Sequence, residues 1–298
     1  MRFQKEELEW GRCPLCPSPA VTSTVQQFDE FSYQRCHCCD IWYLNPHPKE
    51  SVIKNLYSSK EYFKNKNFGN GYQTYEQDKR YYLKTFHRRV KVVQRFIQGN
   101  KGAVLDVGCG LGYMLEVLER FGYEGWGIDF PGYALKNAAI KYGDRIVSID
   151  HATKTMKKNY YTAIWLTDVI EHIYNPQQAL NDYHSWLKKG GIVAIITPAN
   201  DSWLARLSGR RWVSFKIPEH IFLYGTESLK QLVNPFFEIL AIRSVGQYVS
   251  GGFLYERLYR LIPALKRPLE VLLRCRPIKQ AMFYVPSGSI MCIARKRS

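Results

Sequence analysis

A glycine-rich turn follows a short apolar segment in the sequence Asp106-Val-Gly-Cys-Gly-Leu-Gly112. Gly108, Gly110 and Gly112 permit a tight turn and let the backbone approach a ligand at points where a Cβ atom would clash. The helix predicted to follow would offer free N–H groups and the positive end of its dipole to a carboxylate. The G-x-G-x-G spacing differs from the G-x-G-x-x-G spacing of dinucleotide-binding turns. The segment therefore predicts a site for a nucleotide-like ligand.

Acidic residues around this turn indicate which ligand it binds. Asp106 lies two positions before the first glycine, where its carboxylate would attract an amino group, such as that of S-adenosylmethionine, and repel a pyrophosphate. Asp129 ends the next apolar segment, about 20 residues further on, where an acid can hold both ribose hydroxyls. Asp150 follows a third apolar segment, and we expect it to reach the adenine amine. The predicted cofactor-binding residues are Asp106, Gly108, Cys109, Gly110, Gly112, Asp129, Phe130, Asp150, Thr167 and Asp168.

A second group of titratable residues, Asp168-Val-Ile-Glu-His172, directly follows a fourth apolar segment. If the ligand is S-adenosylmethionine, transfer of its sulfonium methyl to a hydroxyl would require a group that accepts the hydroxyl proton and holds the oxygen in line with the sulfonium. His172 suits the role of general base because an imidazole titrates near neutral pH, and Glu171 would orient it. A competing base is His220, two residues after Pro218. The alternative interpretation is structural: Glu171 caps a turn, and His172 makes a hydrogen bond.

Two C-x2-C pairs near the N-terminus are separated by 19 residues. This spacing is typical of a zinc ribbon, in which each pair lies on a tight turn and four thiolates complete a tetrahedron. We expect the metal to be a structural staple for a region too small to fold alone. Contact with nucleic acid and capping of a substrate are the functional alternatives. The predicted zinc ligands are Cys13, Cys16, Cys36 and Cys39, with Cys38 as a spare thiol.

The elements that position these residues alternate between strands and helices from residue 101 onward. Apolar segments predict strands at 103–107, 125–128, 146–149, 163–166, 192–196, 238–244 and 289–294. We therefore expect an α/β fold with a mostly parallel sheet of about seven strands and helices on both faces. The predicted regions are a zinc ribbon at 1–48, a helical connector and cofactor lid at 49–100, and a core at 101–298. Within this core, residues 246–286 predict a basic, amphipathic helical insertion.

Together, these motifs resemble the class I S-adenosylmethionine-dependent methyltransferases, in particular the ubiquinone-biosynthesis O-methyltransferases and the methyltransferases of sugars and natural products. The resemblance rests on Asp106–Gly112, Gly127–Asp129, Asp168–His172 with Asn175-Pro176, Leu187–Gly191 and Thr197-Pro198. It implies a Rossmann-like core, bound S-adenosylmethionine, and S-adenosylhomocysteine as the product. It also implies a divalent ion, Mg²⁺ or Zn²⁺, at Asp168, Glu171 and His172 as an alternative to the general base. One departure is Thr162-Ala163, where the family usually has an acid.

The charge of the chain bears on its acceptor. Lys and Arg total 42 against 26 Asp and Glu, a formal charge of +16, which favours acidic partners without choosing among nucleic acid, lipid headgroups and phosphorylated substrates. The sequence T-D-V-I-E-H stands where enzymes that methylate base amino groups carry N/D-P-P-Y/F. We therefore expect a cytoplasmic enzyme that methylates a hydroxyl of a small-molecule, sugar or lipid-linked acceptor.

Three alternatives stay open from the sequence. An RNA methyltransferase would use the ribbon and the basic surface, and it would bind RNA with a steep salt dependence. A non-catalytic protein would bind S-adenosylmethionine without turnover. Residues 246–286 either lie on an anionic membrane, which would make the enzyme membrane-associated, or pack on the core as a lid. No apolar run reaches the roughly 18 residues of a membrane span.

Overall fold

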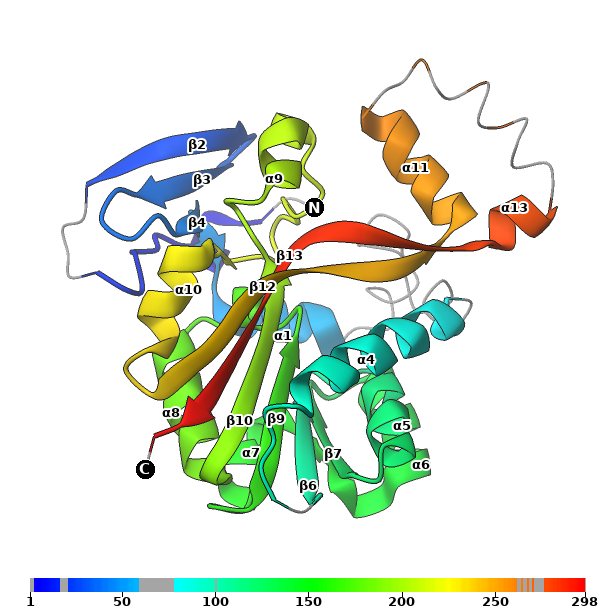
Figure 1. Ribbon diagram of the computed structural model, residues 1–298. Helices are drawn as coiled ribbons and strands as arrows, with labels where there is room; N and C mark the ends of the chain where they lie inside the picture. The colour runs from blue at the N-terminus through cyan, green and yellow to red at the C-terminus, as the bar shows by residue number, and fades with distance from the viewer. Residues whose placement is uncertain are drawn as a thin grey trace.

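The computed structural model describes residues 3–16, 21–58, 78–99, 101–261, 264, 267, 270 and 276–297. At its centre is a seven-stranded sheet, and a smaller four-stranded sheet lies at the end where the central strands lead into α9 (Trp203–Ser208) (Figure 1). The central strands are β6 Ala103–Val107, β7 Glu124–Asp129, β8 Ile146–Ser148, β9 Tyr161–Thr167, β10 Leu187–Pro198, β12 Phe237–Ser250 and β13 Met282–Lys296. The expected α/β class with about seven strands is confirmed.

The order of the central sheet is β12-β13-β10-β9-β6-β7-β8. Strands β6 to β10 run parallel, whereas β13 is antiparallel to both β10 and β12. All five residues of β6 are buried, as expected for a parallel strand that is covered on both faces. The carboxyl ends of β6, β7 and β9 therefore share one edge of the sheet, and the predicted cofactor-binding residues come from that edge.

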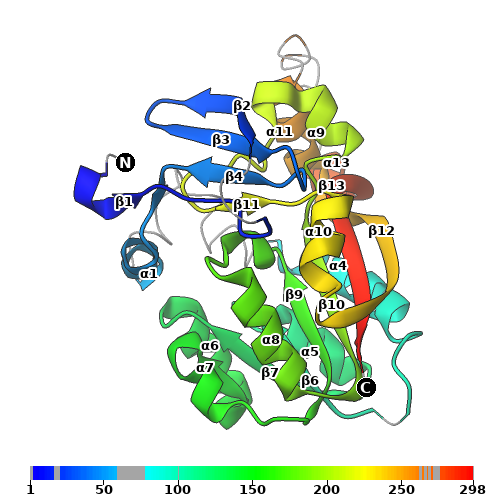
Figure 2. The same ribbon diagram turned by 90° about the vertical axis from the view of Figure 1, so that its left-hand side faces the viewer.

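Helices cover both faces of this sheet, α4 and α5 on one face and α8 and α10 on the other (Figures 1 and 2). The described helices are α1 Glu50–Ser58, α4 Lys79–Val93, α5 Tyr113–Arg120, α6 Tyr133–Tyr142, α7 Ile149–Thr155, α8 Pro176–Trp186, α9 Trp203–Ser208, α10 Thr226–Val233, α11 Gly251–Leu261 and α13 Arg276–Gln280. Along β10, Ile192, Ala194 and Ile196 pack with α4 and α5, whereas Val193 and Ile195 pack with α8 and α10. This alternation follows from the two-residue period of a strand. Among the described helices, none is both long and apolar enough to cross a bilayer.

The N-terminal strands form two small sheets, and a strand from the core joins one of them. They are β1 Leu8–Glu9, β2 Thr22–Phe28, β3 Phe31–Cys36, β4 Trp42–Asn45 and β5 His47–Pro48, and β11 Phe222–Leu223 joins them from the core. The order is β11-β4-β3-β2, while β1 and β5 pair separately (Figure 2). The ribbon expected at 1–48 is therefore completed by a strand that lies more than half-way along the chain.

The prediction of a helical insertion at 246–286 is wrong at both of its ends. β12 continues to Ser250 and β13 begins at Met282, and the two strands pair in register from Gly246↔Pro286 to Ser250↔Met282. The aromatic and β-branched residues in these segments favour a strand over a helix. Helix occurs at α11 and α13, and most of the chain between them lies outside the described residues. The paired strands extend beyond the sheet as a long arm that carries α11 (Figure 1).

Candidate active site

The glycine-rich turn leads from β6 into α5, and its backbone requires glycine at the predicted positions. The φ angles of Gly108, Gly110 and Gly112 are 73°, 52° and 77°, a region that residues with a Cβ atom rarely adopt. A Cβ atom on Gly108 would lie 2.5 Å from Val169 Cγ2, and one on Gly112 would lie 2.6 Å from a ring carbon of Tyr142. Neither contact is tolerable, so the turn depends on these two glycines for space as well as for conformation.

The carboxylate of Asp129 holds this turn closed. At the end of β7, its Oδ2 accepts a hydrogen bond from the backbone N–H of Gly110 and its Oδ1 accepts one from Phe130, both at 2.6 Å. Each oxygen keeps a second lone pair, which can accept a ribose hydroxyl. Asp150 lies instead in the first turn of α7, exposed and 4.0 Å from the ammonium of Lys54. Its predicted contact with adenine stays a prediction.

A cavity of about 250 Å³ lies beside the turn. Of the predicted residues, Asp106, Gly108, Cys109, Thr167 and Asp168 line it, whereas Gly110, Gly112, Asp129, Phe130 and Asp150 do not. The rest of its wall comes from α4 with its N-cap Asp78, from Met114 in α5 and from the junction of β12 with α11. The backbone N–H of Tyr248 in β12 donates to Thr85 Oγ1 in α4 at 2.9 Å, so the two elements are fastened together over the cavity.

Titratable groups in this cavity are shifted toward their neutral forms. Burial, and then the charge of Asp129, raise the pKa of Asp106 well above its usual range. Burial also raises the pKa of the Cys109 thiol, which makes that cysteine a neutral packing residue and a poor nucleophile. A cationic group of a ligand would reverse the first shift, because it favours the carboxylate form of Asp106. The site is therefore suited to an ammonium-bearing ligand.

Arg89 in α4 is a residue of this cavity that sequence reasoning missed. Its side chain is 5% exposed and is the one cation among the described residues that line the cavity. Its Nε lacks a hydrogen-bond partner within the described part of the chain. Burial lowers the pKa of Arg89, and the charge of Asp168 opposes that shift. The available signal was helical spacing, since Phe86, Arg89 and Val93 share one buried face.

Glu171, His172 and His220 meet beside the carboxyl end of β9. Their ligand atoms all lie within 4.8 Å of one another, and the two imidazole rings pack edge to face with centroids 4.8 Å apart. Nδ1 of His172 is 2.8 Å from the carbonyl oxygen of Glu219, and Nδ1 of His220 is 2.9 Å from that of Ser214. A carbonyl oxygen only accepts, so each Nδ1 carries the proton and each Nε2 is the unprotonated nitrogen.

The environment of this cluster keeps its members neutral. Burial, and then the charge of Lys216, lower the pKa of His172 to about 4. Burial and the neighbouring His172 lower the pKa of His220 well below its usual range. Burial, and then the charge of Asp168, raise the pKa of Glu171 to about 8. Neither histidine lines the cavity itself; Asp168, with φ of 54°, is the member of this motif that does.

The set of candidate metal ligands in the core differs from the predicted one. Among the described residues, the structure groups Glu171 and His172 with His220 rather than with Asp168. Glu171 Oε2 accepts a hydrogen bond from Thr197 Oγ1 at 2.9 Å, while Oε1 is buried without a partner among the described groups. A buried carboxylate oxygen and two imidazole nitrogens are donors that a divalent transition metal accepts. The predicted ion site is corrected accordingly, with His220 in place of Asp168.

The four cysteines of the two C-x2-C pairs come together as the spacing predicts. The sulfur atoms of Cys13, Cys16, Cys36 and Cys39 all lie within 4.8 Å of one another, whereas Cys38 is exposed and outside the group. Cys13 Sγ and Cys39 Sγ are 3.4 Å apart, and the hydrogen bond between them lowers the pKa of Cys13 to about 5. Four sulfurs at this separation fit tetrahedral zinc.

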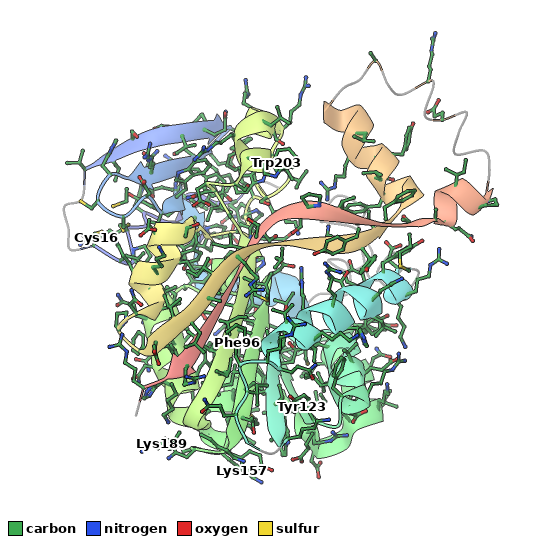
Figure 3. The ribbon with its side chains drawn as sticks, viewed as in Figure 1. Cys16, Phe96, Tyr123, Lys157, Lys189 and Trp203 are labelled. Atoms are coloured by element: carbon green, nitrogen blue, oxygen red, sulfur yellow. The ribbon has the colours of Figure 1, made fainter. Side chains whose placement is uncertain are left out.

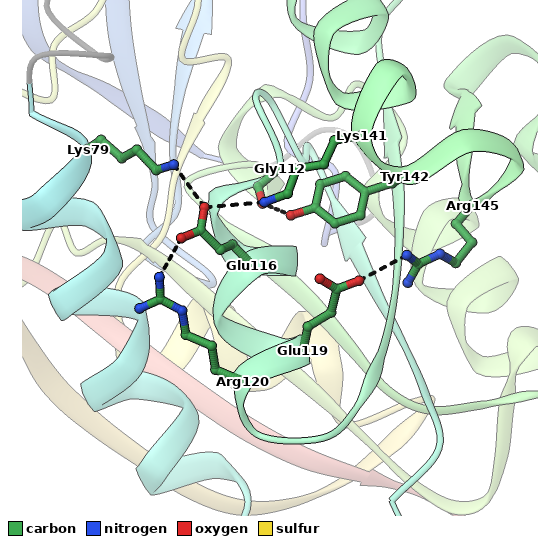
Figure 4. Close-up of polar contacts among 8 residues, drawn as sticks. All are labelled: Lys79, Gly112, Glu116, Glu119, Arg120, Lys141, Tyr142 and Arg145. Atoms are coloured by element: carbon green, nitrogen blue, oxygen red, sulfur yellow. Dashed lines mark hydrogen bonds and ion pairs between the residues drawn. The ribbon is translucent and has the colours of Figure 1, made fainter.

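A network of ion pairs fastens α4 to the helices that follow the glycine-rich turn (Figure 4). The carboxylate of Glu116 in α5 lies 2.9 Å from Lys79, 2.6 Å from Arg120 and 3.4 Å from Lys141. Lys79 is the first residue of α4, and Lys141 is near the end of α6. The Tyr142 hydroxyl donates to the Gly112 carbonyl at 3.2 Å. The network therefore joins three helices around the turn.

Comparisons with known sequences agree with this site. A family model described as a methyltransferase domain matches residues 75–236. Curated relatives include the ubiquinone biosynthesis O-methyltransferases of Erwinia tasmaniensis and Klebsiella pneumoniae, each 26% identical over 140 residues. The match covers 44% of this chain and 56% of each relative. The chain thus spans about half the length of the curated relatives it matches.

Solved structures share the fold. One is an S-adenosylmethionine-dependent methyltransferase from Archaeoglobus fulgidus, 21% identical with a TM-score of 0.50, covering 75% of this chain and 99% of that one. Another, from Thermotoga maritima, is 16% identical with a TM-score of 0.50 and covers 78% and 97%. These likenesses confirm the expected Rossmann-like sheet.

Proposed function

This chain belongs to the methyltransferase domain family, and from that premise we propose that it transfers a methyl group from S-adenosylmethionine to a hydroxyl oxygen of a small-molecule, sugar or lipid-linked acceptor. The observation that carries the proposal is the pair of neutral imidazoles at the carboxyl end of β9. Each has its Nδ1 proton held by a backbone carbonyl oxygen, which leaves Nε2 as the basic nitrogen of the ring. A hydroxyl acceptor needs such a base, whereas a thiolate or an amine nucleophile needs it less.

The cavity residues fit the methyl donor by charge. When bound, S-adenosylmethionine supplies an electrophilic methyl group on a sulfonium. Asp106 faces the cavity as a partner for its ammonium group, and Arg89 faces it as a partner for its carboxylate. The closed turn of Gly108 to Gly112 would carry the ribose beside Asp129. These residues would orient the donor, and α4 with β12 would exclude water from it.

A divalent ion at Glu171, His172 and His220 is the second candidate for this cluster, supported by the unpartnered Glu171 Oε1 and by the two Nε2 nitrogens. The ion would hold and polarise the acceptor hydroxyl, in place of a base that removes its proton. Calorimetry with Mn²⁺ or Zn²⁺ on protein whose ribbon is already zinc-loaded tests this candidate. Binding that persists in His220→Ala would contradict it. The structural zinc would be held by Cys13, Cys16, Cys36 and Cys39.

A lipid-linked acceptor is favoured by the surface of α9. Trp203 and Leu207 are 59% and 71% exposed and lie one turn apart, and Arg206 and Arg210 are exposed beside them. Figure 3 places Trp203 at the same end of the molecule as the arm that carries α11. Exposed Trp and Leu next to Arg are the composition that binds an anionic membrane surface.

Liposome co-sedimentation tests this surface. We expect the protein to pellet with vesicles that contain about one third phosphatidylglycerol and to stay in solution with phosphatidylcholine alone. Trp203→Ala should reduce pelleting several-fold. Trp10→Ala is the matched control, because Trp10 is also exposed, at 79%, but lies at the N-terminus. Equal losses in both variants, or none, would leave the soluble acceptor as the better proposal.

The methyl transfer itself is tested with labelled S-adenosylmethionine and cell extract divided into lipid, RNA and small-molecule fractions. We expect a labelled product with an O-methyl group in the lipid or small-molecule fraction. His172→Ala and His220→Ala should each lower kcat by at least about 100-fold, whereas His151→Ala, on the exposed side of α7, should not. Label in the RNA fraction, with RNA binding that depends steeply on salt, would instead favour an RNA methyltransferase. Binding of S-adenosylmethionine without turnover would instead favour a non-catalytic protein.

A further inference from the structure

The segment that carries His220 has almost no regular structure of its own. Between α9 and α10, the described chain forms only the short helical turn Gly209–Arg211 and the two-residue strand β11. Yet His220 is 2% exposed and must lie within a few ångströms of Glu171 and His172 for the cluster to work. Something outside this segment therefore has to fix its backbone.

The N-terminal ribbon supplies those contacts. The hydroxyl of Tyr33 in β3 donates to the carbonyl oxygen of His220 at 2.8 Å. The backbone N–H of Leu44 in β4 donates to the carbonyl oxygen of Ile221 at 2.9 Å, and β4 then pairs with β11. On its other side, the N–H of Ile221 donates to the carbonyl oxygen of Glu171 at 2.9 Å. The ribbon, the His220 segment and the Glu171 turn thus form one hydrogen-bonded series.

The metal-ligating turn takes part in the same series. Asp40 directly follows Cys39, and its carbonyl oxygen accepts a hydrogen bond from Asn200 Nδ2 at 2.9 Å. The same amide nitrogen donates to the carbonyl oxygen of Leu223 at 3.0 Å. One side chain therefore ties the second cysteine pair to β11. Cys13, Cys36 and Cys39 also belong to the apolar cluster that includes Ile221 and Phe222.

Tyr33 is the residue in this series whose side chain reaches His220 directly. It is fully buried, and it lies three positions before Cys36 in β3. A metal bond from the Cys36 thiolate would fix the end of that strand, and with it the position of the Tyr33 hydroxyl relative to His220. We propose that the metal-bound ribbon is the scaffold that holds His220 against Glu171 and His172, with Tyr33 as its positioning residue. The proposal rests on the proposed role of His220 in methyl transfer.

The hydrogen bonds that close the glycine-rich turn run to Asp129 and do not involve the residues of this scaffold. The glycine-rich turn packs through Cys109, Leu115 and Tyr142 in a separate apolar cluster. Loss of the Tyr33 hydroxyl should therefore lower turnover without changing the affinity for S-adenosylmethionine. A small displacement of a catalytic group can cost about 100-fold in rate, and we expect a fall in kcat between about 10- and 100-fold.

Tyr33→Phe tests the proposal, with Tyr43→Phe as its matched control. Tyr43 is another buried tyrosine of the ribbon, but its hydroxyl interacts with Thr22 inside the ribbon sheet. In Tyr33→Phe we expect full zinc content, an unchanged Kd for S-adenosylmethionine, a lower kcat, and shifted ¹⁵N signals of the His220 imidazole. Tyr43→Phe should leave all four unchanged. Asn200→Asp, which cannot donate to Asp40 and Leu223, should repeat the result if Tyr33→Phe does not fold.

The outcomes separate this inference from the proposed function. If His220→Ala lowers kcat but Tyr33→Phe and Asn200→Asp change neither kcat nor the imidazole signals, the scaffold is wrong and the role of His220 stands. If His220→Ala leaves kcat unchanged, the role of His220 fails. The ¹⁵N signals then decide the scaffold alone: a shift in Tyr33→Phe that is absent in Tyr43→Phe supports it, and identical signals overturn it.

Discussion

Replacement of Arg89 by methionine should weaken binding of S-adenosylmethionine while leaving the protein folded. Arg89 is 5% exposed, lines the cavity, and has Asp168 as a nearby counter-charge. Methionine fills much of the same volume, and the Asp168 carboxylate that loses its counter-charge is exposed to solvent, so the protein should stay folded. The carboxylate of the methyl donor would lose its charged partner. A hydrogen bond to a charged group is worth about 1.5–3 kcal/mol, so Kd should rise about 10- to 100-fold.

Calorimetry with two ligands makes this prediction specific. S-adenosylmethionine has a carboxylate, whereas methylthioadenosine lacks the whole amino-acid part. Arg89→Met should weaken the first and leave the second unchanged. Arg88→Met is the control, because Arg88 is exposed and lies over the ring of Tyr284, outside the residues that line the cavity. Equal weakening of the binding of both ligands would refute the reasoning. Unchanged binding of the donor together with a higher KM for the acceptor would also refute it, because Arg89 would then bind an acidic group of the acceptor.

Three further predictions concern the turn and its surroundings. Glu116→Gln leaves three cations facing one another and should lower the free energy of unfolding by about 1 kcal/mol. In urea denaturation this loss should be smaller at 1 M NaCl than at 0.05 M NaCl, because salt screens the charges. A loss that does not depend on salt would contradict the role of the ion pairs. Gly112→Ala meets both a positive φ of 77° and a ring carbon 2.6 Å away, whereas Gly190→Ala meets a similar φ of 72° in open space. Thermal melts should therefore show the larger loss for Gly112→Ala, by about 1–3 kcal/mol, and equal losses would mean that space is not limiting. The raised pKa of Asp106 means that binding of an ammonium-bearing ligand should release a proton and that affinity should rise with pH; calorimetry in two buffers of different ionisation enthalpy should detect this release in the native protein and not in Asp106→Asn.

The parts of the molecule that local sequence fixes were predictable. Three glycines at alternate positions have a single structural explanation, a turn with positive φ, and the structure has it at all three. The C-x2-C pairs likewise bring four sulfurs together, because each pair needs only a tight turn to present both thiols. The helical connector predicted at 49–100 contains the observed α4, Lys79–Val93, which buries one apolar face. In each case the determining residues lie within one turn or one helix face of one another.

The parts that depend on distant pairing were not predictable. β11 has only two residues and no periodicity to detect, and it is a strand because β4, some 180 residues earlier, presents an edge to it. His220 likewise lies near Glu171 because β4 and the Glu171 carbonyl hold its neighbour Ile221 in place. The extension of β12 and β13 beyond the sheet was mistaken for helix, because basic and aromatic residues in this segment fit an amphipathic helix as well as a paired strand. Arg89 was overlooked since a charged residue within an apolar helix face is usually solvated.

The two proposed roles of the histidine pair place different demands on the chain, and they depend differently on pH. An Nε2 lone pair that binds a metal ion cannot accept a proton in the same step. A general base needs a neutral imidazole, and with a pKa of about 4 His172 is neutral over the whole physiological range, although so low a pKa also makes its Nε2 a weak base. A metal ion needs the Glu171 carboxylate as well, and burial raises the pKa of that group to about 8. Below that pH a metal must displace a proton from Glu171, which weakens its binding about tenfold for each unit of pH. The metal role therefore strengthens as pH rises toward 8, where the carboxylate is already formed, whereas the neutral state of His172 does not change over that range.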